Sequence, residues 1–312
     1  MDKKKRSTYV SIVLYLLILS FLAFYFRKIE WSKFYDIEFN WFYILLSVPI
    51  SLFIRFISPL AWVFLIKSFG QKINSYLQLN YVYAKSWLGR YIPGSVLWIA
   101  GKVYFATEQG ISKKVLLLTS FLEAAVQIFT GAVVAILFIV ASDRLPFLQS
   151  QVRYILLLIL IGFAFFLYPS VFNFIFRKAY KIVKKEELDE GIRFRWSTLL
   201  QVGIIFSLIH AVSGIPFFFI LKTVYPALEY AELVYVSGVT TLAGVIGIVV
   251  IFVPSGLGVR DGIQLVLLSK ILPDEIVIVS VILLRLWSIV LDFAFWSISY
   301  VLKTYFDSPK VN

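Results

Sequence analysis

Residues 89–95, Gly-Arg-Tyr-Ile-Pro-Gly-Ser, combine a basic side chain with a proline and two glycines. Proline is favoured at the first position of a helix, because the N–H group that it lacks would have no partner there. We therefore expect a short helix that begins near Pro93 and ends near Phe105. Its N-terminus would offer free N–H groups and a partial positive charge, with the Arg90 guanidinium beside them. This combination predicts a site for a phosphate or another anion.

One narrow face of that helix carries Gly94, Trp98 and Gly101, which are spaced four and three residues apart. The glycines would let another backbone or a ligand approach closely. We predict that Pro93, Gly94 and Trp98 bind the ligand together with Arg90. The alternative is that the glycines only permit close packing of helices, while the arginine extends its charged end to water.

A second glycine-rich segment occurs at residues 253–262, Val-Pro-Ser-Gly-Leu-Gly-Val-Arg-Asp-Gly. Gly256 and Gly258 permit positive φ and hence a sharp reversal, after which a short helix can begin. Arg260 and Asp261 fall in the first turn of that helix. The two adjacent charges can partly neutralise each other, or they can bind a ligand that carries both charges. We predict that these two glycines and these two charged residues belong to the binding site.

Five ionisable side chains fall inside long apolar runs: Arg55, Glu123, His210, Arg285 and Asp292. A charge at the centre of a bilayer costs about 3 kcal/mol or more, so such residues normally face the protein interior and are paired or functional. Arg285 is the strongest of them as a ligand-binding residue. The other four are candidates for a proton or charge relay. Structural ion pairing is the alternative for each.

Several kinds of chemistry are disfavoured by the composition. The chain has no cysteine and a single histidine, which excludes disulfides, thiolate nucleophiles and metal clusters built from cysteine or several histidines. The glycine-rich segments lack the spacing of a P-loop and of a dinucleotide fingerprint. We therefore expect no catalytic residue, no metal and no cofactor, and no nucleic acid as a partner.

The elements that must position these residues are membrane helices. Hydrophobic residues make up 60% of the 312 residues and charged residues 15%, and the mean hydropathy is +0.87. A soluble domain has about 45–50% apolar and about 25% charged residues. We predict an all-α polytopic membrane protein with about seven to eight transmembrane helices. Seven spans are clear, at about 9–26, 41–66, 115–141, 153–176, 197–221, 232–253 and 276–302.

Two further apolar stretches, about 76–106 and 254–272, are interrupted by proline and glycine. Irregular backbone survives at membrane depth only where it is buried in protein or lines a wet cavity, so we expect two broken, re-entrant segments. Similar spacings around them suggest two pseudo-repeated halves, about 41–141 and 197–302, within a single membrane domain spanning 1–312. Chance placement is the alternative. Repeats with broken helices are typical of transporters.

The distribution of basic residues along the chain predicts how the protein is oriented in the membrane. Twenty of the 30 Lys and Arg residues lie in the N-terminal tail and in residues 67–114, 177–196 and 254–275. Eight lie in the opposite set of connections and the C-terminal tail. The positive-inside rule therefore predicts a multi-pass protein of the cytoplasmic membrane, with its N-terminus and both broken segments on the cytoplasmic side. The basic loop at 177–196 serves this topology or, alternatively, contacts anionic lipid.

The sequence resembles the lysylphosphatidylglycerol synthase transmembrane-region family, whose members are flippase-like integral membrane proteins. That family usually shows Arg-x-x-Pro-Gly, then a Pro-Gly-Gly-x-Gly-x-Arg-Glu core, then an arginine in the following helix. This chain departs from the pattern mildly, with Ser255 for a glycine, Lys102 for the commoner arginine and Asp261 for glutamate. The matching residues are Arg90-Tyr91-Ile92-Pro93-Gly94, Trp98, Gly101-Lys102, the segment from Pro254 to Gly262, and Arg285.

The resemblance implies the membrane part of multiple peptide resistance factors, which moves lysyl-phosphatidylglycerol between leaflets. A soluble aminoacyl transferase domain follows that part in those proteins. This chain ends at Asn312, so we expect no transferase activity. The favoured hypothesis is translocation of a phosphate-bearing lipid, either an anionic phospholipid or a polyprenyl-phosphate lipid. The alternatives are an enzyme of lipid-linked glycan or aminoacyl-phospholipid synthesis, and a membrane subunit that partners a cell-envelope transferase.

Overall fold

The computed structural model describes residues 37–91, 97–144, 168–185, 196–250 and 256–306, together with positions 154, 158, 161, 162 and 165. Within these ranges every regular element is a helix. The elements are α2 (Trp41–Ser68), α3 (Tyr76–Trp87), η2 (Leu88–Tyr91), α4 (Leu97–Thr107), α5 (Lys113–Ser142), α7 (Pro169–Lys184), α8 (Trp196–Val224), η3 (Tyr230–Glu232), α9 (Leu233–Val249), α10 (Val259–Leu268) and α11 (Asp274–Phe306).

Five stretches in the described ranges are long and apolar enough to cross a membrane: α2, α5, α8, η3 with α9, and α11. They coincide with five of the seven predicted spans. The predicted span 9–26 lies outside the described residues, and so do ten of the 24 residues of 153–176, whose last eight residues belong to α7. The predicted all-α polytopic membrane fold is confirmed.

The outer surfaces of these helices are apolar. Phe53 on α2 and Leu208 on α8 are each 61% exposed, and only 28% of the apolar stretch of α2 is buried. In water such a surface would promote aggregation, whereas acyl chains solvate it without cost. The lipid bilayer is therefore the solvent for which this fold is built.

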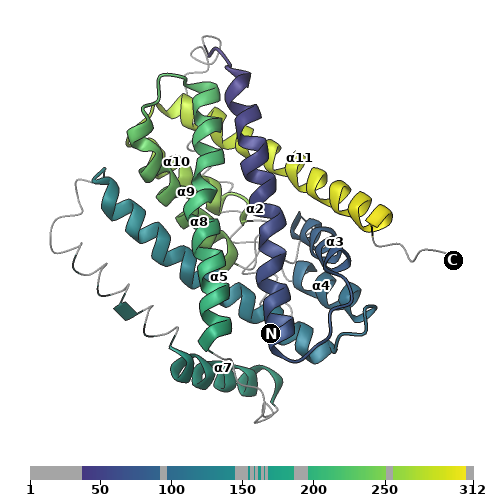
Figure 1. The fold of residues 1–312 in the computed structure, drawn as a ribbon. Coiled ribbons are helices and arrows are strands. Elements are labelled where there is room, and N and C mark those ends of the chain that lie inside the picture. The colour runs from purple at the N-terminus through teal and green to yellow at the C-terminus, as the bar shows by residue number, and fades with distance from the viewer. Residues whose placement is uncertain are drawn as a thin grey trace, which may run out of the picture.

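α2 and α8 lie side by side and run in opposite directions (Figure 1). The Asn40 amide donates to the Thr223 carbonyl at 2.8 Å, which ties the start of α2 to the end of α8. α5 packs against α9, α8 and α4, and α11 crosses the bundle obliquely (Figure 1). α10 contributes Leu265 to a buried cluster with α8, α9 and α11, whereas α4 contributes Val103 to a separate cluster with α2 and α3.

The two predicted broken segments are short helices flanked by irregular backbone. In the first, α3 ends in the 3₁₀ turn η2 and α4 follows; residues 92–96, which include Pro93 and Gly94, lie outside the described residues. In the second, Gly256 and Gly258 have φ of 64° and 78°, so the predicted reversal is present. α10 begins directly after this reversal. It ends at Leu268, where the chain forms a turn, four residues before the end of the predicted segment 254–272.

α8 and α9 approach so closely that a glycine is required between them. A Cβ atom on Gly214 would lie 2.2 Å from the Cα of Ser237. Because that contact is with backbone, rotation of a side chain cannot relieve it. At Gly203, on the same helix, an added Cβ would meet nothing within 4 Å.

We expect Gly214→Ala to destabilise the protein. Alanine in an open helical position is favoured over glycine by about 0.5–1 kcal/mol, but overpacking costs about 1–3 kcal/mol, so the clash should dominate. Thermal unfolding of the detergent-solubilised protein measures this, with Gly203→Ala as the matched control that should be neutral or stabilising. Equal stability of the two variants would show that the helices are not in close contact.

Candidate functional site

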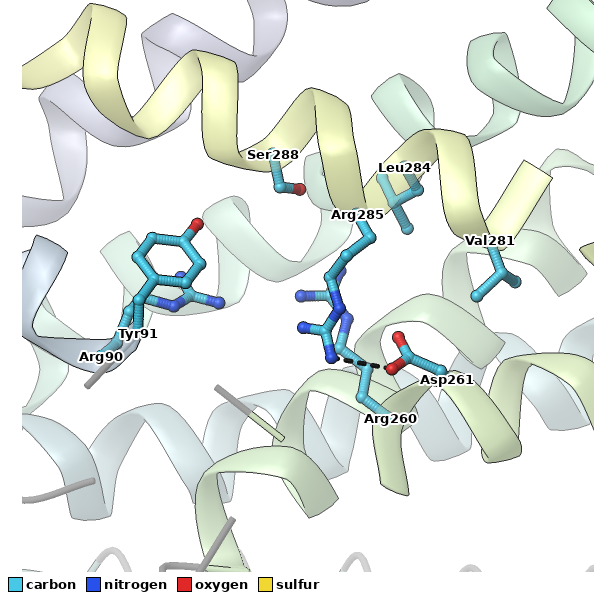
Figure 2. A pocket seen from close by; sticks show the side chains of 8 residues that line it. All are labelled: Arg90, Tyr91, Arg260, Asp261, Val281, Leu284, Arg285 and Ser288. Carbon is cyan, nitrogen blue, oxygen red and sulfur yellow. Dashed lines mark hydrogen bonds and ion pairs between the residues drawn. The ribbon is translucent and has the colours of Figure 1, made fainter. Parts of the chain in front are cut away.

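A small pocket gathers three arginines from three separate elements (Figure 2). Arg90 comes from η2, Arg260 from the first turn of α10 and Arg285 from α11. Figure 2 shows the Arg260 and Arg285 side chains next to each other, with Arg90 and Tyr91 on the other side of the pocket. The remaining lining residues are Asp261, Val281, Leu284 and Ser288.

Asp261 holds α10 against α11. Its Oδ2 atom accepts a hydrogen bond from the Gly258 amide at 2.9 Å and from Arg285 Nη2 at 2.7 Å. A carboxylate in the first turn of a helix is also stabilised by the helix dipole. The sequence predicted partial neutralisation of Asp261 by the adjacent Arg260, but the direct ion pair is with Arg285. This carboxylate therefore occupies the N–H group of Gly258 at the start of α10.

Arg260 has a different environment. Across the part of the chain that the structure describes, no carboxylate lies within ion-pair distance of its guanidinium and no hydrogen bond to it is formed. Burial, and then the nearby Arg90 and Arg285 charges, lower the pKa of Arg260 to about 10, with partial compensation from Asp261 and Asp292. The group is still protonated at neutral pH. It is a half-buried cation that repels its two arginine neighbours.

Asp292 is the second organising carboxylate. Its side chain is fully buried and accepts from Arg55 Nε at 2.7 Å and from the Tyr91 hydroxyl at 2.6 Å. Arg90 Nη1 lies 3.8 Å from the same carboxylate. Arg55 also donates to the Ser288 carbonyl at 3.4 Å. This network joins α2, η2 and α11, and it fixes the side of the pocket on which Arg90 lies.

Arg90 is also held from behind by an aromatic ring. Its guanidinium carbon lies 4.6 Å from the centre of the Trp87 ring, a distance typical of a cation–π contact. Trp87 in turn meets Trp98 edge to face, with the ring centres 5.8 Å apart. Trp98, which was predicted to bind ligand, therefore supports Arg90 through Trp87 and is absent from the residues that line the pocket.

Lys102 and Glu123 form a buried ion pair next to this site, with both side chains 1% exposed. The Tyr83 hydroxyl donates to the other Glu123 oxygen at 2.8 Å. Three aromatic rings surround the ammonium group, with ring centres at 5.0 Å for Trp62, 4.6 Å for Tyr83 and 4.5 Å for Trp98. The arrangement satisfies both charges and connects α4 to α2, α3 and α5.

His210 lies in a separate region of the fold. Its Nε2 atom is 3.0 Å from the Gln127 carbonyl, and its own carbonyl accepts from the Thr241 hydroxyl at 3.3 Å. The ring also packs against Gly131, where an added Cβ would lie 3.0 Å away. These contacts link α5, α8 and α9. They give His210 a packing environment, and its assignment to a relay stays a prediction.

The structure thus brings seven predicted residues to one place, while Pro93 and Gly94 lie outside the described residues. The residues in or next to the pocket are Arg55, Arg90, Gly258, Arg260, Asp261, Arg285 and Asp292. Gly256 shapes the turn that precedes α10, and Glu123 pairs with Lys102. No role was predicted for Tyr91, whose hydroxyl donates to Asp292; its place beside Arg90 in the segment that carries the family resemblance was a sequence signal for it.

The side chains of this site have the chemistry needed to bind an anion. Arginine presents planar N–H donors that match two phosphate oxygens, and burial strengthens such contacts. No group of three or more histidine, cysteine, aspartate or glutamate side chains in the described ranges could hold a metal ion. The polar groups of the pocket are three arginines, a tyrosine, a serine and an aspartate that is already paired.

Comparison with known proteins gives one match. The family model described as lysylphosphatidylglycerol synthase TM region matches residues 9–295. The matched range includes the pocket residues Arg90, Arg260 and Arg285. It also includes Asp261 and Asp292, the two carboxylates that pair with arginines there. A search of curated proteins finds no match.

The Lys102–Glu123 pair gives a test of the electrostatics beside the pocket. We expect Lys102→Met or Glu123→Gln alone to destabilise the protein by about 3–5 kcal/mol, because each leaves one buried charge without its partner. The double variant should recover much of this loss, as measured by thermal unfolding in detergent. Arg144→Gln supplies the control, since the Arg144–Glu232 pair is partly exposed and should contribute at most about 1 kcal/mol. A double variant as unstable as the two single losses added together would contradict the ion pair.

Proposed function

Because this chain belongs to the lysylphosphatidylglycerol synthase transmembrane-region family, we propose that it moves a phosphate-bearing lipid across the cytoplasmic membrane. The observation that carries the proposal is the convergence of Arg90, Arg260 and Arg285 on one pocket, in which Arg260 has no ion pair with any described residue. A half-buried cation without a direct ion pair is costly at membrane depth unless an anion joins it. A lipid phosphate is the anion that a membrane supplies.

In this proposal the head group enters the arginine pocket while the acyl chains stay in the surrounding lipid. Arg260 and Arg285 bind phosphate oxygens, and Arg90 closes the site from η2. The apolar residues Val281 and Leu284, which line the pocket on α11, exclude water from one side of it. The charge of the head group is thereby shielded from hydrocarbon during its passage, which removes the main barrier to lipid movement.

The proposal includes the topology and the partners expected from the sequence. The N-terminus and the basic loop at 177–196 lie on the cytoplasmic side, and the segments around α4 and α10 enter the membrane from that side and return. The lipid is an anionic phospholipid or a polyprenyl-phosphate lipid. Glu123, His210 and Asp292 are the candidates for proton coupling, with Arg55 as a charge partner. A cell-envelope transferase would supply or consume the lipid.

Lipid movement in proteoliposomes tests the proposal. We expect the wild-type protein to accelerate movement of fluorescent phosphatidic acid or phosphatidylglycerol between leaflets, measured by chemical quenching of the outer leaflet. Arg260→Gln should slow that movement about tenfold or more, because it removes the cation that most needs the phosphate. It should leave stability intact, since Arg260 forms no ion pair in the described ranges. Arg90→Ala and Arg285→Ala should also be impaired.

The matched control is Arg144→Gln, which removes an arginine whose ion pair with Glu232 involves neither the pocket nor its networks. It should move lipid at the wild-type rate. Wild-type movement in the Arg260→Gln and Arg285→Ala proteins would overturn the roles assigned to the pocket. A different outcome is that the wild-type protein moves neither lipid in this assay. If one of the lipids is then chemically modified when a partner transferase is added, that result favours the synthetic alternative.

A further inference from the structure

α7 (Pro169–Lys184) occupies the position at which the sequence predicted the end of a span and the start of a basic loop. In Figure 1 it runs across the lower end of α8, whereas the spanning helices run along the bundle. Phe172 holds it there, because this ring is buried in a cluster with residues of α2, α5 and α8. α7 is therefore a crosswise helix that is anchored at one end of the spanning helices.

The charges of α7 have one sign. Residues 169–185 contain five lysine and arginine residues and no aspartate or glutamate, and the acidic run that starts at Glu186 follows after the helix has ended. Three of the basic side chains are exposed, namely Lys178, Lys181 and Lys185. The helices on which α7 packs, α2, α5 and α8, contain a single acidic residue, Glu123, which is paired with Lys102. These helices therefore supply no counter-charge for the lysines of α7.

Exposed aromatic rings indicate the depth of α7 in the membrane. Tyr168 directly precedes α7 and Trp196 begins α8, and their ring centres lie 6.3 Å apart. Both rings are exposed, and Phe174 on α7 itself is 67% exposed. Tyrosine and tryptophan gather where the hydrocarbon meets the head groups, because each ring has an apolar body and a polar tip. The rings therefore indicate that α7 lies at the level of the lipid head groups.

An amphipathic helix in this position binds a membrane surface by burying apolar side chains and by attracting anionic lipids with its lysines. We infer that Lys178, Lys181 and Lys185, the α7 basic face, bind the phosphate groups of anionic phospholipids in the leaflet on that side. The occupant is lipid because anionic phosphates are the counter-charge that a membrane supplies at this depth. The inference does not depend on whether the protein moves lipid.

Energy transfer from α7 to labelled lipids tests the inference. The chain has no cysteine, so Ser170→Cys gives a single labelling site at an exposed position of α7. The full-length protein carries a fluorescent donor there and is reconstituted into phosphatidylcholine vesicles. The acceptor is phosphatidylglycerol or phosphatidylcholine with the same labelled acyl chain. We expect phosphatidylglycerol to be enriched about fivefold near α7, the factor that corresponds to about 1 kcal/mol for a lysine near a membrane surface.

The enrichment should require the α7 basic face. Replacing its three lysines together by glutamine (Lys178→Gln, Lys181→Gln, Lys185→Gln) should bring the preference for phosphatidylglycerol close to unity. Salt at 1 M should have the same effect on the unchanged face, because it shortens the Debye length to about 3 Å. Circular dichroism verifies that the variant is folded.

The matched control removes the same charge elsewhere at the same end of the bundle. α2 ends and α5 begins at that end, where three other lysines are exposed, namely Lys67, Lys72 and Lys113. Their joint replacement by glutamine lowers the net charge by the same amount and should leave the preference measured at α7 nearly unchanged. The control therefore separates the α7 basic face from a general positive charge of this end.

Equal energy transfer to the two lipids in the protein with all its lysines would overturn the inference, and so would an equal loss of preference in both triple variants. If the lipids are equal but soluble polyglutamate changes the donor emission, and only while the three α7 lysines are present, the face binds an acidic protein segment and the lipid assignment is wrong. Enrichment that is lost in the α7 variant and at high salt, and kept in the control, supports the inference. Lipid movement is measured separately, so its failure would overturn the proposed function alone.

Discussion

The Asp261 carboxylate is the contact on which the pocket depends. It accepts from the Gly258 amide at the start of α10 and from Arg285 on α11, so one side chain fixes the position of a short helix and the direction of an arginine. Two positive-φ glycines make the turn that brings Asp261 there. Because this carboxylate is committed to Arg285, the adjacent Arg260 is left with a half-buried charge and no direct ion-pair partner in the described ranges. The structure thus creates a need for an anion at one defined point.

α11 contributes one residue to the ion pair of Asp261 and another to the hydrogen-bond network of Asp292. Arg285 and Asp292 are two helical turns apart on it, and Ser288 lies between them. Arg285 holds α10, whereas Asp292 holds α2 through Arg55 and η2 through Tyr91. The two broken segments come from different buried clusters of the fold. They meet at the pocket because one long helix carries a binding group for each.

Much of the fold was predictable from hydropathy. Five long apolar runs are helices with nearly the predicted ends, because the cost of unpaired backbone groups in lipid leaves few alternatives to a helix. The reversal before α10 followed from glycine spacing. The end of α10 at Leu268 did not, since the four residues before Pro273 could each continue a helix, whereas the chain forms a turn there. The two-halved organisation stays a prediction.

The sequence by itself determined that several arginines and aspartates fall inside or next to long apolar runs, since hydrophobic length and charge position are local properties. It could not assign partners, because ion pairing depends on which helices become neighbours. Their adjacent positions in the sequence favoured an ion pair between Arg260 and Asp261. Tertiary structure instead pairs Asp261 with Arg285, twenty-four residues away. It also pairs Arg55 with Asp292, 237 residues away. Tertiary structure also places the Trp98 ring against Trp87, whose ring contacts the Arg90 guanidinium. Only the folded arrangement decided which arginine keeps an unsatisfied charge, because that depends on the distances between side chains from separate helices.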